Sequence, residues 1–281
     1  MSKNRPIHRD ASKSSSNFSA QHLLVNKGLI QELIRLANIR PADTVLDIGA
    51  GTGAITLPLA EKAANVVAIE NDSDFIGKLS QKTGDKTNIN IWRADFLQTR
   101  LPDIPFSVVA NIPYSITTPI LKKLLDSPAG SLQRAALIVE KGAAKRFTSY
   151  PITDPRILKW RIWFDIRMVR TISPDHFSPR PRVDSAILTI CRRASTTVPP
   201  KHHLRFMALA VHGLRFPQLP FFQALGEVFS PPQIMKLARS LGIDRNHPIC
   251  QLTELQWSIL FMAMLQHVQP DRWPRIPKKY K

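Results

Sequence analysis

Cysteine is scarce in this sequence: only Cys191 and Cys250 occur among its 281 residues. The two form no CxxC pair and no metal-ligand spacing with histidine, so we predict neither a disulfide-stabilised fold nor a metal site. Long hydrophobic runs are missing as well. No stretch approaches the roughly 20 apolar residues of a membrane span, and the N-terminus lacks the apolar segment of a signal peptide. These absences favour a soluble protein of the reducing cytoplasm.

Acidic residues are outnumbered: 21 Asp and Glu stand against 39 Lys and Arg, a formal net charge of +18. An excess of this size is typical of proteins that meet a polyanion, and nucleic acid is the first candidate. A surface that is merely basic and solvated is the alternative. The excess is densest in residues 191–281, which hold 13 of the basic residues and only 4 acidic ones.

Between the termini, short β-branched runs alternate with helical patterns. Near-continuous apolar strands separated by helices are typical of a parallel sheet covered on both faces, so the predicted fold class is α/β with a Rossmann-like sheet. The predicted strands are Thr44–Ile48, Val66–Glu70, Ile89–Trp92, Ser107–Ala110 and Ala135–Val139, with helices such as Lys27–Asn38 and Thr118–Leu125 between them. A later run, Ala186–Cys191, predicts an extra strand that pairs at an edge.

The last third of the chain has helical periodicity only. Ser230 and Pro231 predict the start of a helix and Gly242 its end, while Thr253 and Gln256 predict a capping box at the start of another. A smaller all-helical C-terminal domain therefore follows the sheet.

A predicted strand runs into a glycine turn at residues 47–53, Asp-Ile-Gly-Ala-Gly-Thr-Gly. Glycines let the backbone turn sharply and approach a ligand closely. Glu70 ends the next strand, where a carboxylate can bind two ribose hydroxyls, and Asp95 follows the third, where it can accept a hydrogen bond from an adenine amino group. Asp47, before the glycines, suits the cationic amino-acid end of S-adenosylmethionine better than a pyrophosphate. The pattern predicts S-adenosylmethionine as cofactor, with a dinucleotide as the alternative.

The segment Asn111-Ile112-Pro113-Tyr114 directly follows the fourth predicted strand. The exocyclic amine of adenine is a poor nucleophile because its lone pair is delocalised into the ring. The Asn111 side-chain oxygen and the Ile112 carbonyl can accept its N–H groups and so free that lone pair. Pro113 fixes the backbone without adding a donor, and the ring of Tyr114, more than its hydroxyl, offers a face for a flipped base. Transfer then depends on positioning and electrostatics.

With these motifs the chain resembles the Erm family of ribosomal RNA adenine N6-methyltransferases, enzymes of macrolide–lincosamide–streptogramin B resistance. The resemblance lies in residues 17–24, 47–53, 70, 94–96, 111–114 and 177–185, in the family's order. It implies a class I methyltransferase fold. It also implies mono- or dimethylation of N6 of a specific adenine in 23S rRNA, with S-adenosylhomocysteine as product and no metal.

The resemblance further implies roles for individual residues. The implied cofactor contacts are His22, Leu24, Gly49, Gly51, Glu70, Asp95 and Asn111. Phe177 is implied to pack the target adenine against Tyr114, although core packing is the alternative for such an aromatic. The chain departs from the family at His22, where many members have Asn, and at Ala94, where Gly or a charged residue is often seen.

Basic residues gather near the predicted site, since residues 134–193 hold 13 basic and 5 acidic residues. Either a solvated helix face or a groove for RNA backbone accounts for such a cluster. The candidate RNA contacts are Lys141, Lys145, Arg146, Arg180 and Arg182, and the same basic segment continues through Arg156, Lys159 and Arg161. The expected partner is 23S rRNA, bound by a monomer before full ribosome assembly.

We expect four segments along the chain. Residues 1–17 form a basic disordered arm, residues 18–193 the catalytic domain, and residues 194–268 the helical RNA-binding domain. Residues 269–281 form a basic tail that is either solvated or in contact with RNA.

Three other identities share parts of this pattern. The KsgA type of small-subunit (16S) rRNA adenine dimethyltransferase has the same fold and catalytic loop, but it usually opens its helical domain with an R-K-x-L motif that residues 206–214, FMALAVHGL, lack. A mitochondrial transcription factor of the same ancestry would be expected to lose Asn111 or Tyr114. A dinucleotide-dependent oxidoreductase would bind NAD in place of S-adenosylmethionine.

Overall fold

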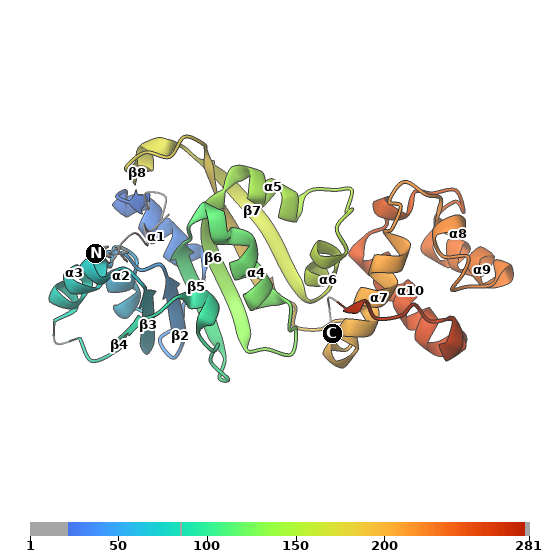
Figure 1. Ribbon diagram of the computed structural model, residues 1–281, viewed down its shortest axis with the longest axis horizontal. Helices are drawn as coiled ribbons and strands as arrows, with labels where there is room; N and C mark the ends of the chain where they lie inside the picture. Colours follow the sequence, from blue (N-terminus) through green and yellow to red (C-terminus); the bar gives the residue numbers. More distant parts are fainter. Residues whose placement is uncertain (1–21, 85, 279–281) are drawn as a thin grey trace, which may run out of the picture.

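The structure is a computed structural model that describes residues 22–84 and 86–278. The arm expected at residues 1–17 lies outside these residues, as do the last three residues of the basic tail. The molecule is elongated, with a part that contains the sheet at one end and a group of helices at the other (Figure 1).

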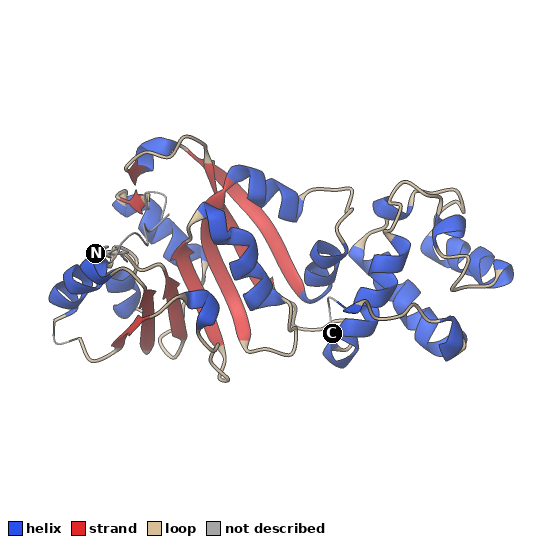
Figure 2. Cartoon of the chain, viewed as in Figure 1, coloured by secondary structure: helices blue, strands red, loops and turns tan. Residues whose placement is uncertain are grey.

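A seven-stranded sheet forms the centre of the larger part (Figure 2), in the order β4-β3-β2-β5-β6-β9-β7. The five strands from β4 to β6 are parallel, whereas β9 is antiparallel to both of its neighbours. The strands are β2 (Thr44–Ile48), β3 (Asn65–Glu70), β4 (Ile89–Arg93), β5 (Phe106–Asn111), β6 (Leu132–Glu140), β7 (Phe164–Ile172) and β9 (Ser185–Arg192). The predicted α/β class with a Rossmann-like sheet is confirmed.

Helices cover both faces of this sheet, as the apolar strands require. The helices of this part are α1 (Lys27–Leu36), α2 (Thr56–Ala60), α3 (Ser73–Thr83), α4 (Thr117–Leu125), α5 (Lys141–Thr148) and α6 (Pro155–Trp163). On one face, Leu33 and Ile34 of α1 pack in a cluster with Val109 of β5. On the other, Ile120 of α4 packs in a cluster with Val108. Adjacent residues of β5 thus point into opposite halves of the core.

The far side of the sheet differs from the sequence prediction. The strand predicted at residues 186–191 is β9, but it lies between β6 and β7 and is not at an edge. The edge is β7, which the sequence analysis did not predict. Its sequence FDIRMVRTI places exposed Arg167 and Arg170 among apolar residues. Charged side chains on an edge strand discourage pairing with a further strand, and here they hid the strand pattern.

After β9 the chain is helical. The helices are α7 (His203–Gly213), α8 (Phe221–Ala224), α9 (Pro231–Leu241) and α10 (Glu254–His267). The predicted capping holds: α9 begins after Ser230 and ends at Gly242, whose φ is 65°, and Thr253 forms a capping box with Gln256.

The helical part and the sheet part share one hydrophobic core. The buried ring of Trp163, at the end of α6, lies 5.7 Å from that of Phe206 in α7, which lies 5.4 Å from that of Phe261 in α10. Among the described residues, no helix is long and apolar enough to cross a membrane.

Candidate active site

The carboxyl ends of the parallel strands meet at one edge of the sheet, where ligands of such folds bind. Gly49, Gly51 and Gly53 follow β2 with φ values of 72°, 54° and 86°, a region in which other residues are strained. A Cβ added to Gly49 would face Pro113 Cδ at 3.8 Å and the Asn111 carbonyl oxygen at 4.0 Å. The glycine turn therefore lies directly opposite the segment that follows β5.

Glu70 ends β3 and is 2% exposed, and both of its carboxylate oxygens accept hydrogen bonds. Its Oε2 accepts the Gly51 N–H at 2.8 Å. Its Oε1 accepts the N–H groups of Asn71 and Asp72, at 2.9 and 3.0 Å. This residue holds the glycine turn to the β3–α3 loop, a role that the sequence analysis did not foresee.

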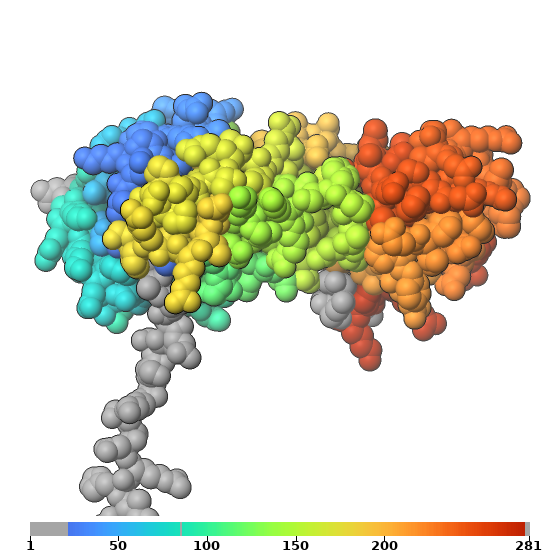
Figure 3. Space-filling model, turned by 90° about the horizontal axis from the view of Figure 1, so that it is seen from above, coloured from blue at the N-terminus to red at the C-terminus, as the bar shows by residue number. Residues whose placement is uncertain are grey.

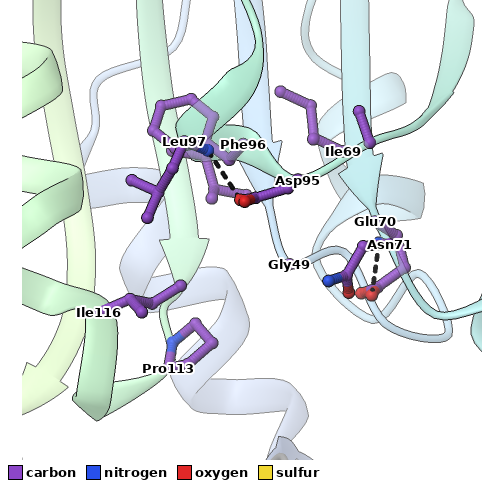
Figure 4. A pocket seen from close by; sticks show the side chains of 11 residues that line it. Gly49, Ile69, Glu70, Asn71, Asp95, Phe96, Leu97, Pro113 and Ile116 are labelled. Carbon is purple, nitrogen blue, oxygen red and sulfur yellow. Dashed lines mark hydrogen bonds between the residues drawn. The ribbon is translucent and has the colours of Figure 1, made fainter. Parts of the chain in front are cut away.

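A hollow opens beside the glycine turn (Figure 4). Gly49, Glu70, Asp95 and Pro113 lie in its wall, together with apolar side chains such as that of Ile69. Asp95 is exposed, and its Oδ1 caps a short helix by accepting the Leu97 N–H at 2.9 Å. Its Oδ2 can then accept a hydrogen bond from an amino group in the hollow.

Asp47 lies beneath the glycine turn and is 1% exposed. Its Oδ2 accepts a hydrogen bond from the Thr56 hydroxyl at 2.7 Å, while its Oδ1 is buried without a hydrogen-bond partner among the described residues. Burial raises the pKa of Asp47 to about 7; the negative charge of Glu70 adds to this, and the Thr56 hydrogen bond opposes it. A cation near this carboxyl would favour its ionised form.

Asn111 is the last residue of β5, and its side-chain Nδ2 donates to the His22 carbonyl at 2.7 Å. That bond orients the amide and leaves Oδ1 as its acceptor atom. The next residue, Ile112, is buried and donates its N–H to Ile138 of β6 at 3.2 Å. The backbone of the predicted catalytic segment is thereby tied to the sheet.

Tyr114 begins a short 3₁₀ turn, Tyr114–Ile116, and is half-buried. Its ring lies 5.9 Å from that of His22, and its hydroxyl lies 2.5 Å from Ser185 Oγ. Burial raises the pKa of Tyr114, against the effect of the Ser185 hydrogen bond, so the phenol stays neutral. A second hollow is lined by His22, Tyr114 and residues 179–183.

Two predicted contacts have side chains that are buried in the core. Leu24 of β1 (Leu23–Leu24) pairs with Phe177 of β8 (Phe177–Ser178), and the two segments lie side by side in Figure 3, in blue and yellow. Leu24 and Phe177 are 5% and 2% exposed, and both belong to the hydrophobic cluster that includes the buried residues of α1. The structure does not bring Phe177 to the hollow beside Tyr114, so its packing here is that of a core residue. Stacking on a base would require the β1–β8 pair to open.

The candidate RNA contacts near the site differ in whether their charged groups already have partners within the chain. Lys145 and Arg182 are exposed. The other three have partners within the chain: Lys141 pairs with Asp184 at 2.9 Å, Arg180 with Asp175 at 2.9 Å, and Arg146 donates to Thr118 at 2.6 Å. Exposed ion pairs are weak, so a phosphate can displace Asp175 from Arg180.

Two further members of the basic segment are internal. Lys159 is 4% exposed and donates to the Asp126 carbonyl at 2.5 Å, and Arg161 is 7% exposed and pairs with Glu254 at 2.5 Å. Their charged groups are engaged within the protein, that of Lys159 at the end of α4 and that of Arg161 at the start of α10, so they are less available to RNA than exposed cations. Sequence charge alone did not distinguish these buried cations from exposed ones.

The fold and the site together define a class I methyltransferase: a glycine turn, acids at successive strand ends and Asn111-Ile112-Pro113-Tyr114 surround one edge of the sheet. A family model for ribosomal RNA adenine dimethylase matches residues 12–265. An rRNA adenine N-6-methyltransferase of Bacillus licheniformis is 47% identical over 265 residues, 94% of this chain and 92% of that protein. The chain belongs to the ribosomal RNA adenine dimethylase family.

A solved structure and a more distant relative place the chain within this family. The crystal structure of the 23S rRNA methyltransferase ErmE matches with a TM-score of 0.78 and 25% identity, over 86% of this chain and 99% of that one. A ribosomal RNA small subunit methyltransferase A of Dehalococcoides mccartyi is 29% identical over 249 residues, 85% of each chain. The Erm-type resemblance therefore has stronger support than the small-subunit alternative.

Proposed function

We propose that this protein transfers methyl groups from S-adenosylmethionine to N6 of a specific adenine in 23S rRNA and so confers macrolide–lincosamide–streptogramin B resistance. The observation that carries the proposal is the position of Asn111. Its backbone carbonyl faces Gly49 of the glycine turn, and its side-chain Nδ2 donates to the His22 carbonyl. The side-chain Oδ1 of Asn111 is thus left as an acceptor for an amine.

The residues present fit S-adenosylmethionine. Gly49 leaves open the space that a Cβ would fill between the turn and Pro113. Asp95 offers a carboxylate oxygen in a hollow with apolar walls, which suits an adenine ring with an amino group. The unpartnered Oδ1 of Asp47 lies beneath the turn and favours a cationic neighbour. When bound, S-adenosylmethionine supplies an electrophilic methyl group.

The chain's own residues then position the amine. Asn111 Oδ1 and the Ile112 carbonyl accept its N–H groups, and the hydrogen bond from Ile112 N–H to the Ile138 carbonyl ties this segment to β6. Tyr114 presents its ring to the flipped base, and His22, whose ring lies 5.9 Å from that of Tyr114, lines the same hollow. Because these groups are held before the substrate arrives, they can stabilise the transition state without reorganisation. The proton leaves to water after transfer.

RNA contacts are proposed for Lys145, Arg146, Arg180 and Arg182, and for Lys141 where phosphate competes with Asp184. We further propose that residues 18–193 act as the catalytic domain and residues 194–268 as the RNA-binding domain. On this view a cytoplasmic monomer methylates 23S rRNA before ribosome assembly is complete. The net charge of +18 supports such a partner.

The test is primer extension on rRNA from cells with and without the protein. We expect a new stop in 23S rRNA, accompanied by a higher inhibitory concentration of a macrolide. Asn111→Ala serves as the control and should give neither effect. A new stop confined to 16S rRNA would show that the protein is of the small-subunit type, and no stop in either RNA would overturn the proposal.

A further inference from the structure

The contact between Tyr114 and Ser185 joins the base-stacking residue to the interior of the sheet. The two hydroxyl oxygens lie 2.5 Å apart, with either one able to donate. Ser185 is 0% exposed, so no water competes for its hydroxyl. It is the first residue of β9, far along the chain from the Asn111–Tyr114 segment.

Ser185 is a rigid partner because strands flank it on both sides. It lies opposite Glu140 of β6 and Ile172 of β7 in the sheet register. Tyr114, in contrast, lies in a 3₁₀ turn of three residues and is half-buried. Its ring and that of His22 are 5.9 Å apart and tilted by 35°, a contact that leaves the ring some freedom. The hydroxyl contact removes that freedom at the far end of the side chain.

The segment that enters β9 is fixed as well. The carbonyl of Asp184 accepts the Lys141 backbone N–H at 3.0 Å, and its carboxylate pairs with the Lys141 ammonium at 2.9 Å. Residues 179–183, just before this pair, form the wall of the second hollow. Ser185 therefore links Tyr114 to the end of the segment that lines the same hollow.

We infer that Ser185 is a positioning residue, whose hydroxyl holds the Tyr114 ring in the orientation in which a flipped adenine stacks on it. The inference rests on the proposed function, in which Tyr114 contacts the base. It modifies the expectation that only the ring of Tyr114 matters, because removal of the Tyr114 hydroxyl also removes the anchor.

A double-mutant cycle in single-turnover methylation of an rRNA fragment tests this role. Tyr114→Phe and Ser185→Ala should each lower the rate by about two- to tenfold, the range expected when one hydrogen bond is removed. The double variant should be no slower than the slower single variant, because both changes remove the same contact. Ser107→Ala, which removes an equally buried hydroxyl from β5, should leave the rate unchanged. Independent, multiplying losses would overturn the inference, as would a wild-type rate for Ser185→Ala.

Thermal unfolding of the four proteins of the cycle (wild type, the two single variants and the double variant) without RNA separates this inference from the proposed function. The melting temperatures should also be non-additive, since the contact exists without substrate. If the wild-type protein methylates no rRNA, the proposed function fails, and additive melting shifts would then refute the contact independently. If Ser185→Ala only lowers the melting temperature and leaves the rate intact well below it, the residue is structural and the inference is wrong.

Discussion

At the scale of single residues, Glu70 has a structural role besides the cofactor contact predicted for it. Its two carboxylate oxygens accept three backbone N–H groups, from Gly51, Asn71 and Asp72. From its place at the end of a strand, Glu70 was predicted to bind the ribose hydroxyls of the cofactor. That role stays a prediction. What the structure adds is that the carboxylate shapes the turn against which the cofactor would lie.

Glu70→Ala is therefore expected to weaken both cofactor binding and the fold. The Gly51 N–H would lose its acceptor in a buried place, which costs about 1–3 kcal/mol. Glu70→Gln keeps one acceptor oxygen and should lose less stability. Urea unfolding and calorimetry with S-adenosylmethionine measure the two effects. An alanine variant as stable as the wild type would show that water replaces the carboxylate without loss.

Asp47 predicts a pH dependence of stability. Burial raises its pKa in the folded protein to about 7, whereas in the unfolded chain it is about 3.9. Between these values the folded state holds a proton that the unfolded state has lost. The free energy of unfolding should thus fall as the pH rises from about 4 to 7, by an amount on the order of a few kcal/mol in total.

The comparison of wild type with Asp47→Asn isolates this effect, because Asn cannot ionise and its Oδ1 can still accept from Thr56. Without cofactor, the stability of the variant relative to wild type should increase from pH 5 to pH 8. Parallel stability curves over that range would show that Asp47 ionises in the folded protein as it does in water.

At the scale of elements, periodicity predicted the parallel strands well. The predicted Thr44–Ile48 coincides with β2, and the Asn111–Tyr114 segment follows β5 as expected. These elements are encoded locally, by apolar runs and turn residues. The burial of Phe177 and the interior place of β9 were not predictable in this way. Both depend on pairings between distant segments, β1 with β8 and β9 with β7.

The basic tail is another element whose role depends on distant contacts. Arg272 donates to the Glu227 carbonyl at 3.1 Å, and Trp273 Nε1 donates to Val268 at 2.9 Å. The guanidinium of Arg205 lies 4.5 Å from the Trp273 ring centre. The first part of the tail is thus packed against the helical part, which neither expectation for residues 269–281 anticipated.

Two truncations should therefore behave differently. Removal of residues 274–281 takes away four basic residues and no acidic one. It should leave the melting temperature unchanged and lower the log–log salt slope of RNA binding by about 0.7–0.9 for each phosphate that no longer meets a basic side chain. Removal of residues 269–281 should also lower the melting temperature, since Trp273 is removed with it. If the shorter truncation leaves the salt slope unchanged, its basic residues do not bind RNA.

At the scale of the whole molecule, a buried charge cluster joins the sheet part to the helical part. Arg161 of α6 pairs with Glu254, the first residue of α10, at 2.5 Å and donates to the Ser149 carbonyl at 3.2 Å. Its guanidinium lies 4.2 Å from the ring centre of Tyr150, whose hydroxyl also donates to Glu254. The side chains of Arg161 and Glu254 are only 8% and 18% exposed. Together with the shared aromatic core, this cluster fixes the position of the helical part relative to the sheet part.

Glu254→Ala is expected to destabilise the whole molecule, because it leaves the buried guanidinium of Arg161 without its acidic partner. Loss of one member of a buried ion pair costs about 3–5 kcal/mol. Asp103→Ala is the matched control: its pair with Arg100 at 2.9 Å has both side chains at least 80% exposed, so the change should cost at most about 1 kcal/mol. Because the core is shared, urea unfolding followed by tryptophan fluorescence and by circular dichroism should give one coincident transition for both variants. Two separate transitions in the wild type would show that the helical part unfolds independently, and the cluster would then not couple the two parts.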